Sequence, residues 1–353
     1  MTTQDKEDLR TMKAYRMLDW GRALLCDVPV PQPKAGEVRL RVGGNGLCMS
    51  DIHALDRWGA SPPTHLDIAL PMTMGHEIAG WIDALGPGVS GWAQGQSCVV
   101  TAGGCGHCRR CAEGWNNYCS FIRKFPGLGE DGGLAEYVVL PQHYLVSAGS
   151  LEPWQAAPLT DAGLSSYHAV KRVAPLLLPG SSVLVIGVGG LGHIGIAALK
   201  AITAARIIAI DPRQEALQLG ADQGADICLN SGDLTPLTIL NQVGHVDAVL
   251  DFVGTGDTMK LAASVIRPHG HIVVVGRGSG VFEMHSGALP YGAMLSTTFG
   301  GSKGELMEVI ALAEAGRLPV HLSRHTLDEV PEMLDKLRRG EILGRAVIVP
   351  QAS

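Results

Sequence analysis

The stretch SVLVIGVGGLG at residues 182–192 decides the fold of this chain. Residues 183–186 form a continuous apolar run, which is typical of a strand buried on both faces of a parallel sheet. A glycine-rich turn follows, and residues 193–205 (HIGIAALKAITAA) place apolar side chains at helical spacing. A strand, a tight turn and a helix in this order predict the first βαβ unit of an α/β domain.

Further strands follow this unit along the chain. They are RIIAID (206–211), DICLN (226–230), VDAVLDFVG (246–254) and HIVVVG (271–276), with helix-length segments between most of them. Strands that alternate with helices predict a Rossmann domain with a doubly wound parallel sheet, over residues 162–301. We expect the strand near residues 271–276 at the edge of this sheet, as a contact between subunits.

The glycine-rich turn satisfies the pattern G-x-G-x-x-G. The pattern alone is weak in a chain with 46 glycines, but here it joins a strand to a helix, and Asp211 ends the next strand, 19 residues after the last glycine. That context is the dinucleotide fingerprint, in which the turn approaches a pyrophosphate at the helix N-terminus. The alternative is an ordinary strand–helix turn. The candidate cofactor residues of the turn are Gly187, Gly189, Gly190, Leu191 and Gly192.

Asp211 also predicts which cofactor binds. Its carboxylate can accept hydrogen bonds from both hydroxyls of an adenosine ribose and repels a 2′-phosphate, which favours NAD over NADP. Arg213, two residues further on, is a candidate contact that can accommodate such a phosphate.

The first half of the chain is β-rich. Strand-like runs occupy residues 38–44, 78–86, 97–104 and 134–141. Near the C-terminus, residues 305–316 and 328–340 have amphipathic helical patterns, and RAVIVP (345–350) is strand-like. We expect the first eleven residues to be a disordered overhang.

Composition excludes several classes of protein. The chain has 353 residues, enough for about two domains, and a formal net charge of −6, which argues against a nucleic-acid partner. No run reaches the roughly 18 apolar residues of a membrane helix, so no membrane association is expected. The polar N-terminus of mixed charge resembles neither a signal nor a transit peptide. We therefore expect a cytoplasmic protein with reduced thiols.

Four of the eight cysteines crowd into fifteen residues: Cys105, Cys108, Cys111 and Cys119. Four thiolates in one loop fit a closed tetrahedral zinc site that stabilises the loop. Disulfides, a redox Cys-x-x-Cys pair and an iron–sulfur cluster are the alternatives, and His107 is expected in solvent. A zinc-ribbon interaction module is disfavoured by the net charge and the Rossmann half.

A second metal constellation is scattered. Cys48 lies in GLCMSDIH and His76 in MGHE. A catalytic zinc needs three protein ligands and one open position, and the residues alone do not name the third. A buried cysteine and a core histidine are the alternatives.

Together these motifs resemble the zinc-dependent alcohol dehydrogenases of the medium-chain dehydrogenase/reductase superfamily. GLCMSDIH, GHE, the four-cysteine lobe, GVGGLG and Asp211 occur in the family's order, from about Met12 to the C-terminus. The family's third catalytic ligand, usually Cys, precedes the cofactor domain. APLTDAGLSSYHAV (157–170) contains no Cys, and a similar bacterial subset uses Asp, so the resemblance implies Asp161. A helix N-cap is the alternative role for Asp161.

The resemblance implies further site residues. Glu77 matches a carboxylate close behind the metal, and Asp51 matches a partner of the histidine ligand. Zinc would lower the pKa of a bound alcohol, a hydride would pass to NAD, and Ser50 and His53 would relay the proton. The resemblance also implies cofactor contacts at Val253, Gly254, Gly276 and Arg345, with an exposed strand-edge arginine as the alternative for Arg345.

The resemblance places Met49, Trp58, Phe299 and Gly300 in the substrate pocket. Three of them are apolar and Gly300 leaves space, so we expect a hydrophobic secondary or aryl alcohol and its ketone or aldehyde. A polyol (sorbitol-type) dehydrogenase and a non-catalytic NAD-binding scaffold are the alternatives. The first would turn over polyols, and the second would bind NAD without turnover.

The implied architecture has two domains and two zinc ions per chain, one catalytic and one structural. A distorted β-barrel (GroES-like) catalytic domain spans residues 1–161, with the structural zinc lobe at 103–120. The Rossmann domain spans 162–301, and residues 302–353 return to the catalytic domain. We expect a homotetramer, with a homodimer as the alternative.

Overall fold

The computed structural model describes residues 10–56, 58–61, 63, 66–101, 103–122, 124–233 and 235–350. The chain forms two compact units. The first contains Met1–Asp161, Ser302–Glu314 and Leu322–Ser353, and the second contains Ala162–Gly301 and Ala315–His321. Residues 315–321, which the sequence places with the catalytic domain, therefore cluster with the Rossmann unit. Of the expected N-terminal overhang, residues 1–9 lie outside the described part, whereas Thr11 already pairs with Pro29 in a strand.

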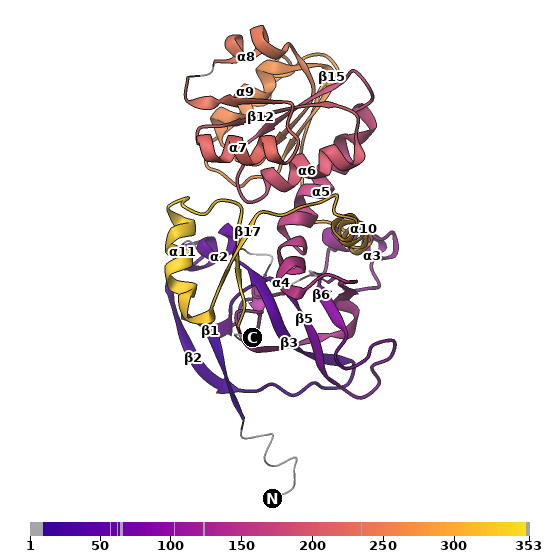
Figure 1. Cartoon of the computed structure of the whole chain (residues 1–353), viewed down its shortest axis with the longest axis vertical. Coiled ribbons are helices and arrows are strands. Elements are labelled where there is room, and N and C mark those ends of the chain that lie inside the picture. The colour runs from indigo at the N-terminus through magenta and orange to yellow at the C-terminus, as the bar shows by residue number, and fades with distance from the viewer. Residues whose placement is uncertain are drawn as a thin grey trace, which may run out of the picture. The chain divides into compact units, whose positions relative to one another are not determined.

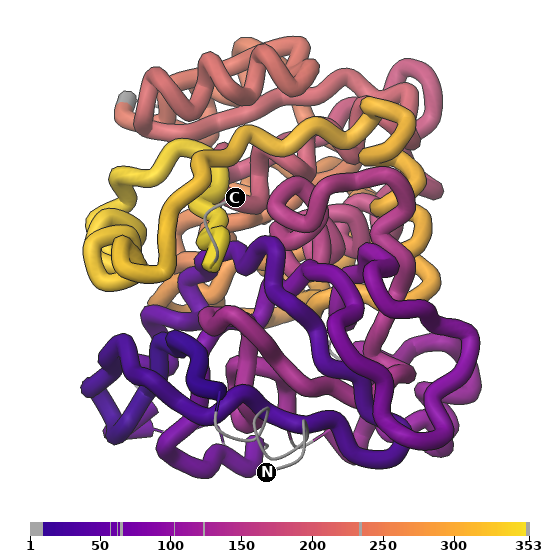
Figure 2. The backbone as a smooth tube through the Cα atoms, turned by 60° about the horizontal axis from the view of Figure 1, so that its bottom comes forward, coloured from indigo at the N-terminus to yellow at the C-terminus, as the bar shows by residue number. Residues whose placement is uncertain are grey.

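The first unit is built around strand β3 (Glu37–Gly46), which pairs with three other strands of a seven-stranded sheet. The order is β10-β6-β5-β3-β18-β17, and β9 also pairs with β3. These strands are β5 (Glu77–Leu85), β6 (Ser97–Val100), β9 (Tyr137–Pro141), β10 (Leu145–Ser147), β17 (Leu322–His325) and β18 (Arg345–Ile348). The yellow C-terminal end of the chain thus returns to the indigo strand β3 (Figures 1 and 2), through the pairing of β18 with β3.

Two smaller sheets and several short helices complete this unit. The sheets are β2-β1-β4 and β7-β8. Their strands are β1 (Thr11–Asp19), β2 (Arg22–Pro29), β4 (Met72–Thr73), β7 (Phe125–Pro126) and β8 (Gly129–Glu130). The α-helices are α2 (Met49–Asp56), α3 (Arg109–Ala112), α4 (Pro153–Ala156), α10 (Lys303–Glu314) and α11 (Val330–Arg338). The 3₁₀ helices are η1 (Asn116–Tyr118), η2 (Gln142–Tyr144), η3 (Ala157–Leu159) and η6 (Leu327–Glu329).

The second unit contains a six-stranded sheet in which every pairing is parallel. The strands are β11 (Ser182–Ile186), β12 (Arg206–Asp211), β13 (Ile227–Asn230), β14 (Val246–Asp251), β15 (Ile266–Val274) and β16 (Met294–Thr297). The helices are α5 (Ala162–Val173), η4 (Ala174–Leu176), α6 (Gly192–Ile202), α7 (Gln214–Asp222), η5 (Ser231–Asp233), α8 (Pro236–Val243) and α9 (Gly256–Val265). The strand order β13-β12-β11-β14-β15-β16 is the 3-2-1-4-5-6 order of a doubly wound Rossmann sheet. The predicted fold class is therefore confirmed.

One expectation about this sheet is wrong. The strand near residues 271–276 is not at the edge, because β15 lies between β14 and β16. The edge strand on this side is β16, which has only four residues and a half-exposed pattern. Such a short stretch gives neither a clear alternation nor a continuous apolar run.

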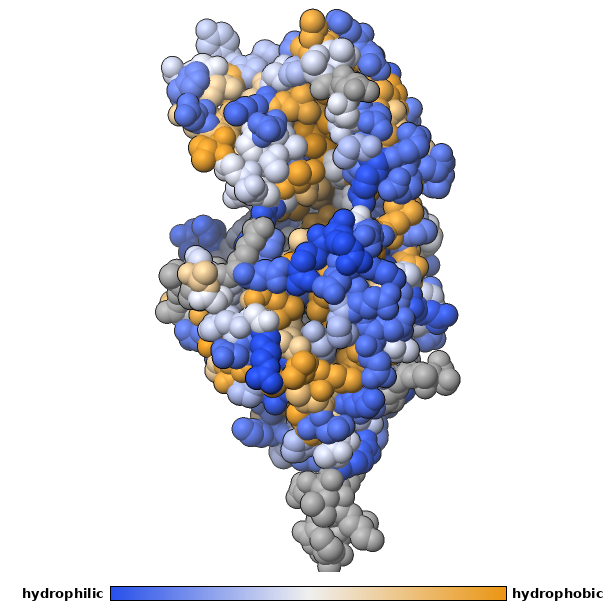
Figure 3. Space-filling model, turned by 90° about the vertical axis from the view of Figure 1, so that its left-hand side faces the viewer, coloured by the Kyte–Doolittle hydropathy of each residue, from blue (hydrophilic) through white to orange (hydrophobic). Residues whose placement is uncertain are grey.

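The strands of the parallel sheet are aliphatic, and their side chains form a core of Leu, Ile and Val with few aromatics. The described part of the chain has no helix with the length and apolarity to cross a membrane. The face drawn in Figure 3 mixes hydrophilic and hydrophobic side chains.

Candidate active site

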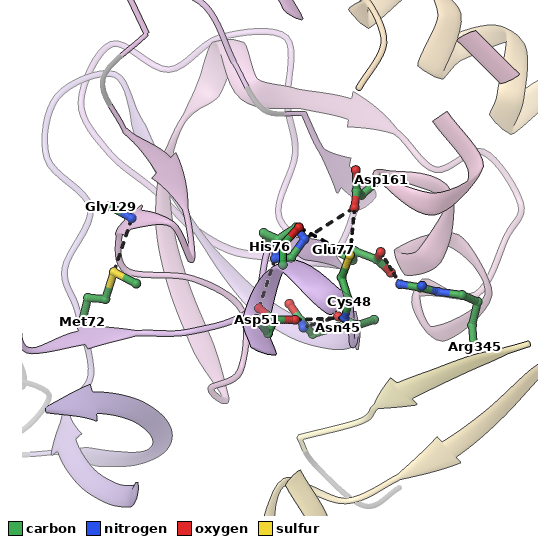
Figure 4. A network of polar contacts seen from close by, with 11 residues as sticks. Asn45, Cys48, Asp51, Met72, His76, Glu77, Gly129, Asp161 and Arg345 are labelled. Atoms are coloured by element: carbon green, nitrogen blue, oxygen red, sulfur yellow. Dashed lines mark hydrogen bonds and ion pairs between the residues drawn. The ribbon is translucent and has the colours of Figure 1, made fainter. Parts of the chain in front are cut away.

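The first unit brings together four candidate metal ligands that are far apart in the sequence. Cys48 immediately precedes helix α2, His76 precedes β5, Glu77 begins β5, and Asp161 immediately precedes α5. One ligand atom from each lies within 4.8 Å of the others. The Oδ2 atom of Asp161 is 3.5 Å from the Sγ atom of Cys48 and 3.5 Å from the Nε2 atom of His76 (Figure 4).

These distances fit a zinc ion. Zinc bonds of roughly 2.0–2.3 Å in a tetrahedron place neighbouring ligand atoms about 3.3–3.8 Å apart. Thiolate, imidazole and carboxylate are all ligands that zinc accepts. The Nε2 atom of His76 is buried and has no hydrogen-bond partner among the described residues, as a metal-directed lone pair requires. Three such ligands leave one tetrahedral position open, which is typical of a catalytic zinc.

Asp51 contacts two of the candidate ligands and fixes their orientation. Its Oδ1 atom lies 3.1 Å from the Nδ1 atom of His76, and its Oδ2 atom accepts a hydrogen bond of 2.9 Å from the backbone N–H of Cys48. A carboxylate only accepts, so Nδ1 carries a proton and Nε2 is the ring nitrogen that faces the cluster and would bind a metal. Burial is the largest single effect and lowers the pKa of His76, but the Asp51 carboxylate together with side-chain hydrogen bonds from Asp161, Asp51 and Cys48 raises this pKa above its ordinary value. The expected partnership of Asp51 with the histidine is confirmed.

Glu77 is held by a cation that the sequence interpretation assigned elsewhere. Its side chain is fully buried, and its Oε1 atom accepts a short hydrogen bond from Nη2 of Arg345, which is 4% exposed. Arg345 is therefore not an exposed strand-edge residue, because β18 lies between β3 and β17. Burial raises the pKa of Glu77, and the Arg345 guanidinium opposes that rise. The contact of Arg345 with a pyrophosphate stays a prediction.

Space for the Glu77 carboxylate depends on a glycine. A Cβ atom at Gly46 would lie 1.8 Å from the Oε2 atom of Glu77. That oxygen is buried and has no hydrogen-bond partner among the described residues. The carboxylate therefore fills the space beside β3 and keeps one oxygen near the cluster.

The expected proton relay begins beside the cluster. The Oγ atom of Ser50 lies 3.7 Å from the Sγ atom of Cys48. His53 follows three residues later on the same helix, α2, and is half-buried. Residues three apart share a helix face, so the order of the two side chains suits a relay, which stays a prediction.

The four cysteines of the lobe form a second tetrahedral set. Their Sγ atoms are 4.0 Å apart for Cys105 and Cys111 and 3.8 Å apart for Cys108 and Cys119. Zn–S bonds of about 2.3 Å predict an edge of about 3.8 Å, whereas a disulfide needs about 2.05 Å. Backbone N–H donation at Cys111 is the largest cause that lowers the pKa of Cys108 to about 6, which favours the thiolate that zinc binds. His107 is exposed and contacts the Cys105 carbonyl, as expected.

The glycine-rich turn of the second unit has the geometry of a phosphate-binding turn. Gly187 has a φ of +85°, and a Cβ at Gly192 would lie 1.9 Å from the carbonyl oxygen of Gly187. A Cβ at Gly189 would meet only Nη2 of Arg213, at 3.7 Å, so the backbone there is open to a ligand. Gly190 and Leu191 complete the turn before α6.

Asp211 lies beside this turn. Its Oδ2 atom accepts a hydrogen bond of 2.8 Å from the backbone N–H of Val188, and its Oδ1 atom lies 3.2 Å from Nε of Arg213. The carboxylate therefore stands where the second strand ends, next to the phosphate-binding backbone. The predicted ribose contact has the position that the fingerprint requires.

The other predicted cofactor residues follow strands β14 and β15. The Oδ1 atom of Asp251 accepts hydrogen bonds of 2.9 Å from the backbone N–H groups of both Val253 and Gly254. A Cβ at Gly276 would lie 2.3 Å from the carbonyl carbon of Val253, so a glycine is required where these two segments cross. Val253 also contacts the turn, since its Cγ2 atom is 2.7 Å from an ideal Cβ at Gly187. The residues lie together, and their contact with cofactor stays a prediction.

The four expected pocket residues are divided between the units. Met49 and Phe299 expose 42% and 39% of their surface, and Trp58 is half-buried. Gly300 has a φ of +52°, so any larger residue there is strained before its size matters. Their role in substrate binding stays a prediction.

Comparisons with known proteins agree with this geometry. Residues 34–150 match the alcohol dehydrogenase GroES-like domain family, and residues 190–315 match the zinc-binding dehydrogenase family. An NAD-dependent alcohol dehydrogenase of Sulfurisphaera tokodaii is 33% identical over 350 residues, covering 96% of this chain and 100% of that protein.

Two crystal structures share the fold along almost the whole chain. The alcohol dehydrogenase of Aeropyrum pernix has a TM-score of 0.88 at 32% identity, covering 96% of this chain and 100% of that one. Acetophenone reductase of Geotrichum candidum, in complex with NAD, has a TM-score of 0.84 at 30% identity, covering 96% and 97%. The chain belongs to the zinc-dependent alcohol dehydrogenases of the medium-chain dehydrogenase/reductase superfamily, and it is an NAD-dependent enzyme.

Proposed function

We propose that this enzyme reversibly transfers a hydride between NAD and a hydrophobic secondary or aryl alcohol, and that Cys48, His76 and Asp161 hold its catalytic zinc. The observation that carries the ligand set is the pair of 3.5 Å distances from the Asp161 carboxylate to the sulfur and the imidazole nitrogen. Two anionic ligands and one neutral ligand balance the charge of Zn²⁺. Cys105, Cys108, Cys111 and Cys119 hold the structural zinc.

When bound, zinc lowers the pKa of the alcohol hydroxyl, and NAD accepts the hydride. The chain's own residues then have three tasks. Ser50 accepts the hydroxyl proton and passes its own toward the His53 imidazole. Asp51 holds Nδ1 of the His76 imidazole, which orients Nε2 toward the other ligands. Arg345 binds the buried Glu77 carboxylate and balances its charge beside the residues that would hold the zinc.

The substrate class is proposed from apolar side chains that remain exposed. Met49 and Phe299 are large and apolar, yet 42% and 39% of their surface is open to solvent. Contact with an apolar substrate would remove this surface from water, at about 25 cal/mol per Å². The similar protein from Geotrichum candidum is named for an aryl ketone, acetophenone, which supports the aryl assignment. A polyol would bring hydroxyl groups against these side chains without hydrogen-bond partners.

We also propose that the protein is a homo-oligomer, a tetramer with the dimer as alternative. Light scattering coupled to size-exclusion chromatography measures the mass directly. A single monomer peak at the 37.2 kDa of one chain would overturn this.

The test of the function is the initial rate of NADH formation with primary, secondary, benzylic and polyol alcohols at matched concentration. We expect the highest kcat/KM with 1-phenylethanol and other apolar secondary or benzylic alcohols. A preference for polyols would overturn the substrate assignment and leave the zinc chemistry intact. NAD binding without any turnover would favour the scaffold alternative.

The proton relay is tested with a pair of variants. Ser50→Ala should lower kcat by about 10²–10⁴-fold, the usual contribution of a positioned proton carrier. Ser50→Thr retains the hydroxyl and should recover most of that loss. Equal activity of the two variants would exclude a role for the hydroxyl.

A further inference from the structure

His193 is a buried histidine that no step above uses. It directly follows the last glycine of the phosphate-binding turn, in the first turn of α6, and its surface is fully buried. Its Nδ1 atom lies 2.8 Å from the carbonyl oxygen of Gly189, closer than the 3.3 Å between that oxygen and the His193 backbone nitrogen. The side chain therefore makes the shorter of the two hydrogen bonds to the middle of the turn.

The second ring nitrogen contacts a different part of the same unit. The backbone N–H of His321 donates a hydrogen bond of 3.3 Å to the Nε2 atom of His193. A carbonyl can only accept and a backbone N–H can only donate. The ring is therefore the neutral tautomer with its proton on Nδ1, fixed from both sides.

His321 ends the segment Ala315–His321, which joins the Rossmann unit although its neighbours in sequence belong to the first unit. Near the other end of this segment, Arg317 donates a hydrogen bond to the carbonyl oxygen of Ala201, in the last turn of α6. The segment is thus attached near both ends of the helix that begins at the cofactor turn.

The bond to Gly189 has a consequence for the turn. In a trans peptide the C=O of one residue and the N–H of the next point in opposite directions. When His193 holds the Gly189 carbonyl toward the helix, the Gly190 N–H points away from it. A Cβ at Gly189 would meet nothing closer than 3.7 Å, so the backbone of this peptide is open to a ligand. N–H groups aimed outward at a helix N-terminus bind phosphate oxygens.

We propose that His193 is a positioning residue for the pyrophosphate of NAD: it fixes the Gly189–Gly190 peptide so that its N–H faces the phosphate. This rests on the assignment of the turn to NAD. A net hydrogen bond of about 0.5–1.5 kcal/mol corresponds to a change of about 2- to 10-fold in affinity.

Two variants of His193 separate this role from packing. His193→Asn places an amide N–H near the position of Nδ1 and keeps the donor to Gly189. His193→Gln places its amide near the position of Nε2 and loses that donor. Thr203→Val is the matched control, because it removes a side-chain hydrogen bond of the same 2.8 Å length at the far end of α6, to the Leu199 carbonyl.

The experiment measures the dissociation constants of NADH, ADP and adenosine with the zinc-loaded enzyme, by NADH fluorescence and competition. We expect His193→Gln to raise the dissociation constants of NADH and ADP by about 2- to 10-fold. The dissociation constant of adenosine should not change, because adenosine lacks the diphosphate. His193→Asn and Thr203→Val should bind all three ligands like the unchanged enzyme.

Equal affinities of the Asn and Gln variants for NADH would overturn the positioning role. So would a loss of adenosine binding that matches the loss of ADP binding, since that pattern indicates general damage to the fold. If the unchanged enzyme bound neither NADH nor ADP, the assignment of the turn would fail and this proposal with it. If the unchanged enzyme and both His193 variants bound NADH with the same affinity, the role of His193 would be overturned and the assignment of the turn to NAD would stand.

Discussion

Replacing Arg345 with leucine should strongly destabilise the first unit. The guanidinium is 4% exposed and its carboxylate partner, Glu77, is fully buried, so Arg345→Leu leaves a charge in the interior without a partner. Breaking a buried ion pair in this way costs about 3–5 kcal/mol. At about 2–4 °C per kcal/mol for a unit of this size, the Tm should fall by about 6–20 °C.

The measurement is thermal unfolding of the zinc-loaded enzyme by calorimetry, with one control and one double variant. Arg338→Leu removes a 39% exposed arginine whose two partners, Asp56 and Asp335, are 41% and 60% exposed, so its cost should stay near or below about 1 kcal/mol. The double variant Arg345→Leu with Glu77→Leu removes both charges and should recover most of the lost Tm. A drop below about 2 °C in Arg345→Leu, or a double variant no better than the single one, would refute this reasoning.

Three further changes have defined outcomes. Asp211→Ala removes the carboxylate that repels a 2′-phosphate, so the ratio of kcat/KM for NADP to that for NAD should rise at least about tenfold, and an unchanged ratio would count against the ribose contact. Cys108→Ser should lower the zinc content by one ion per chain, whereas Cys228→Ser, outside both clusters, should not; zinc loss in both would disprove the assignment. Glu329 accepts hydrogen bonds from the backbone N–H and hydroxyl of Thr326, which lower its pKa to about 2. A carboxyl group whose pKa is lowered by folding stabilises the fold at any pH above its ordinary pKa, and this stabilisation is lost as the pH falls toward 2. The Tm of Glu329→Gln should therefore be lower than that of the wild type at pH 7, and the difference should shrink between about pH 5 and 2. A Tm difference that does not depend on pH would contradict this cause.

Local patterns carried most of what could be predicted. Gly187 is required by its positive φ, and Gly192 is required because its backbone lies against the carbonyl oxygen of Gly187. Both requirements arise within six residues, so the sequence alone predicts the turn. The four cysteines lie within one loop, and their spacing alone brings them together. The parallel sheet followed from the alternation of strands and helices, whereas the place of β15 within the sheet did not.

What could not be predicted depends on distant residues. Glu77 and Arg345 are 268 positions apart, and His193 and His321 are 128 apart. No periodicity or spacing links such pairs. A buried glutamate next to a metal ligand does require a cation, however, and the arginine that begins the otherwise apolar run RAVIVP is a signal that could have identified it.

The zinc content of the wild type and of two Asp161 variants tests the proposed metal centre most directly. Asp161→Ala removes the ligand, whereas Asp161→Asn removes its charge and keeps a side chain able to cap α5. We predict two zinc ions per chain in the wild type and one in both variants, with the four-cysteine site still loaded. Two zinc ions in Asp161→Asn would instead show that Asp161 caps the helix and that the third catalytic ligand lies elsewhere.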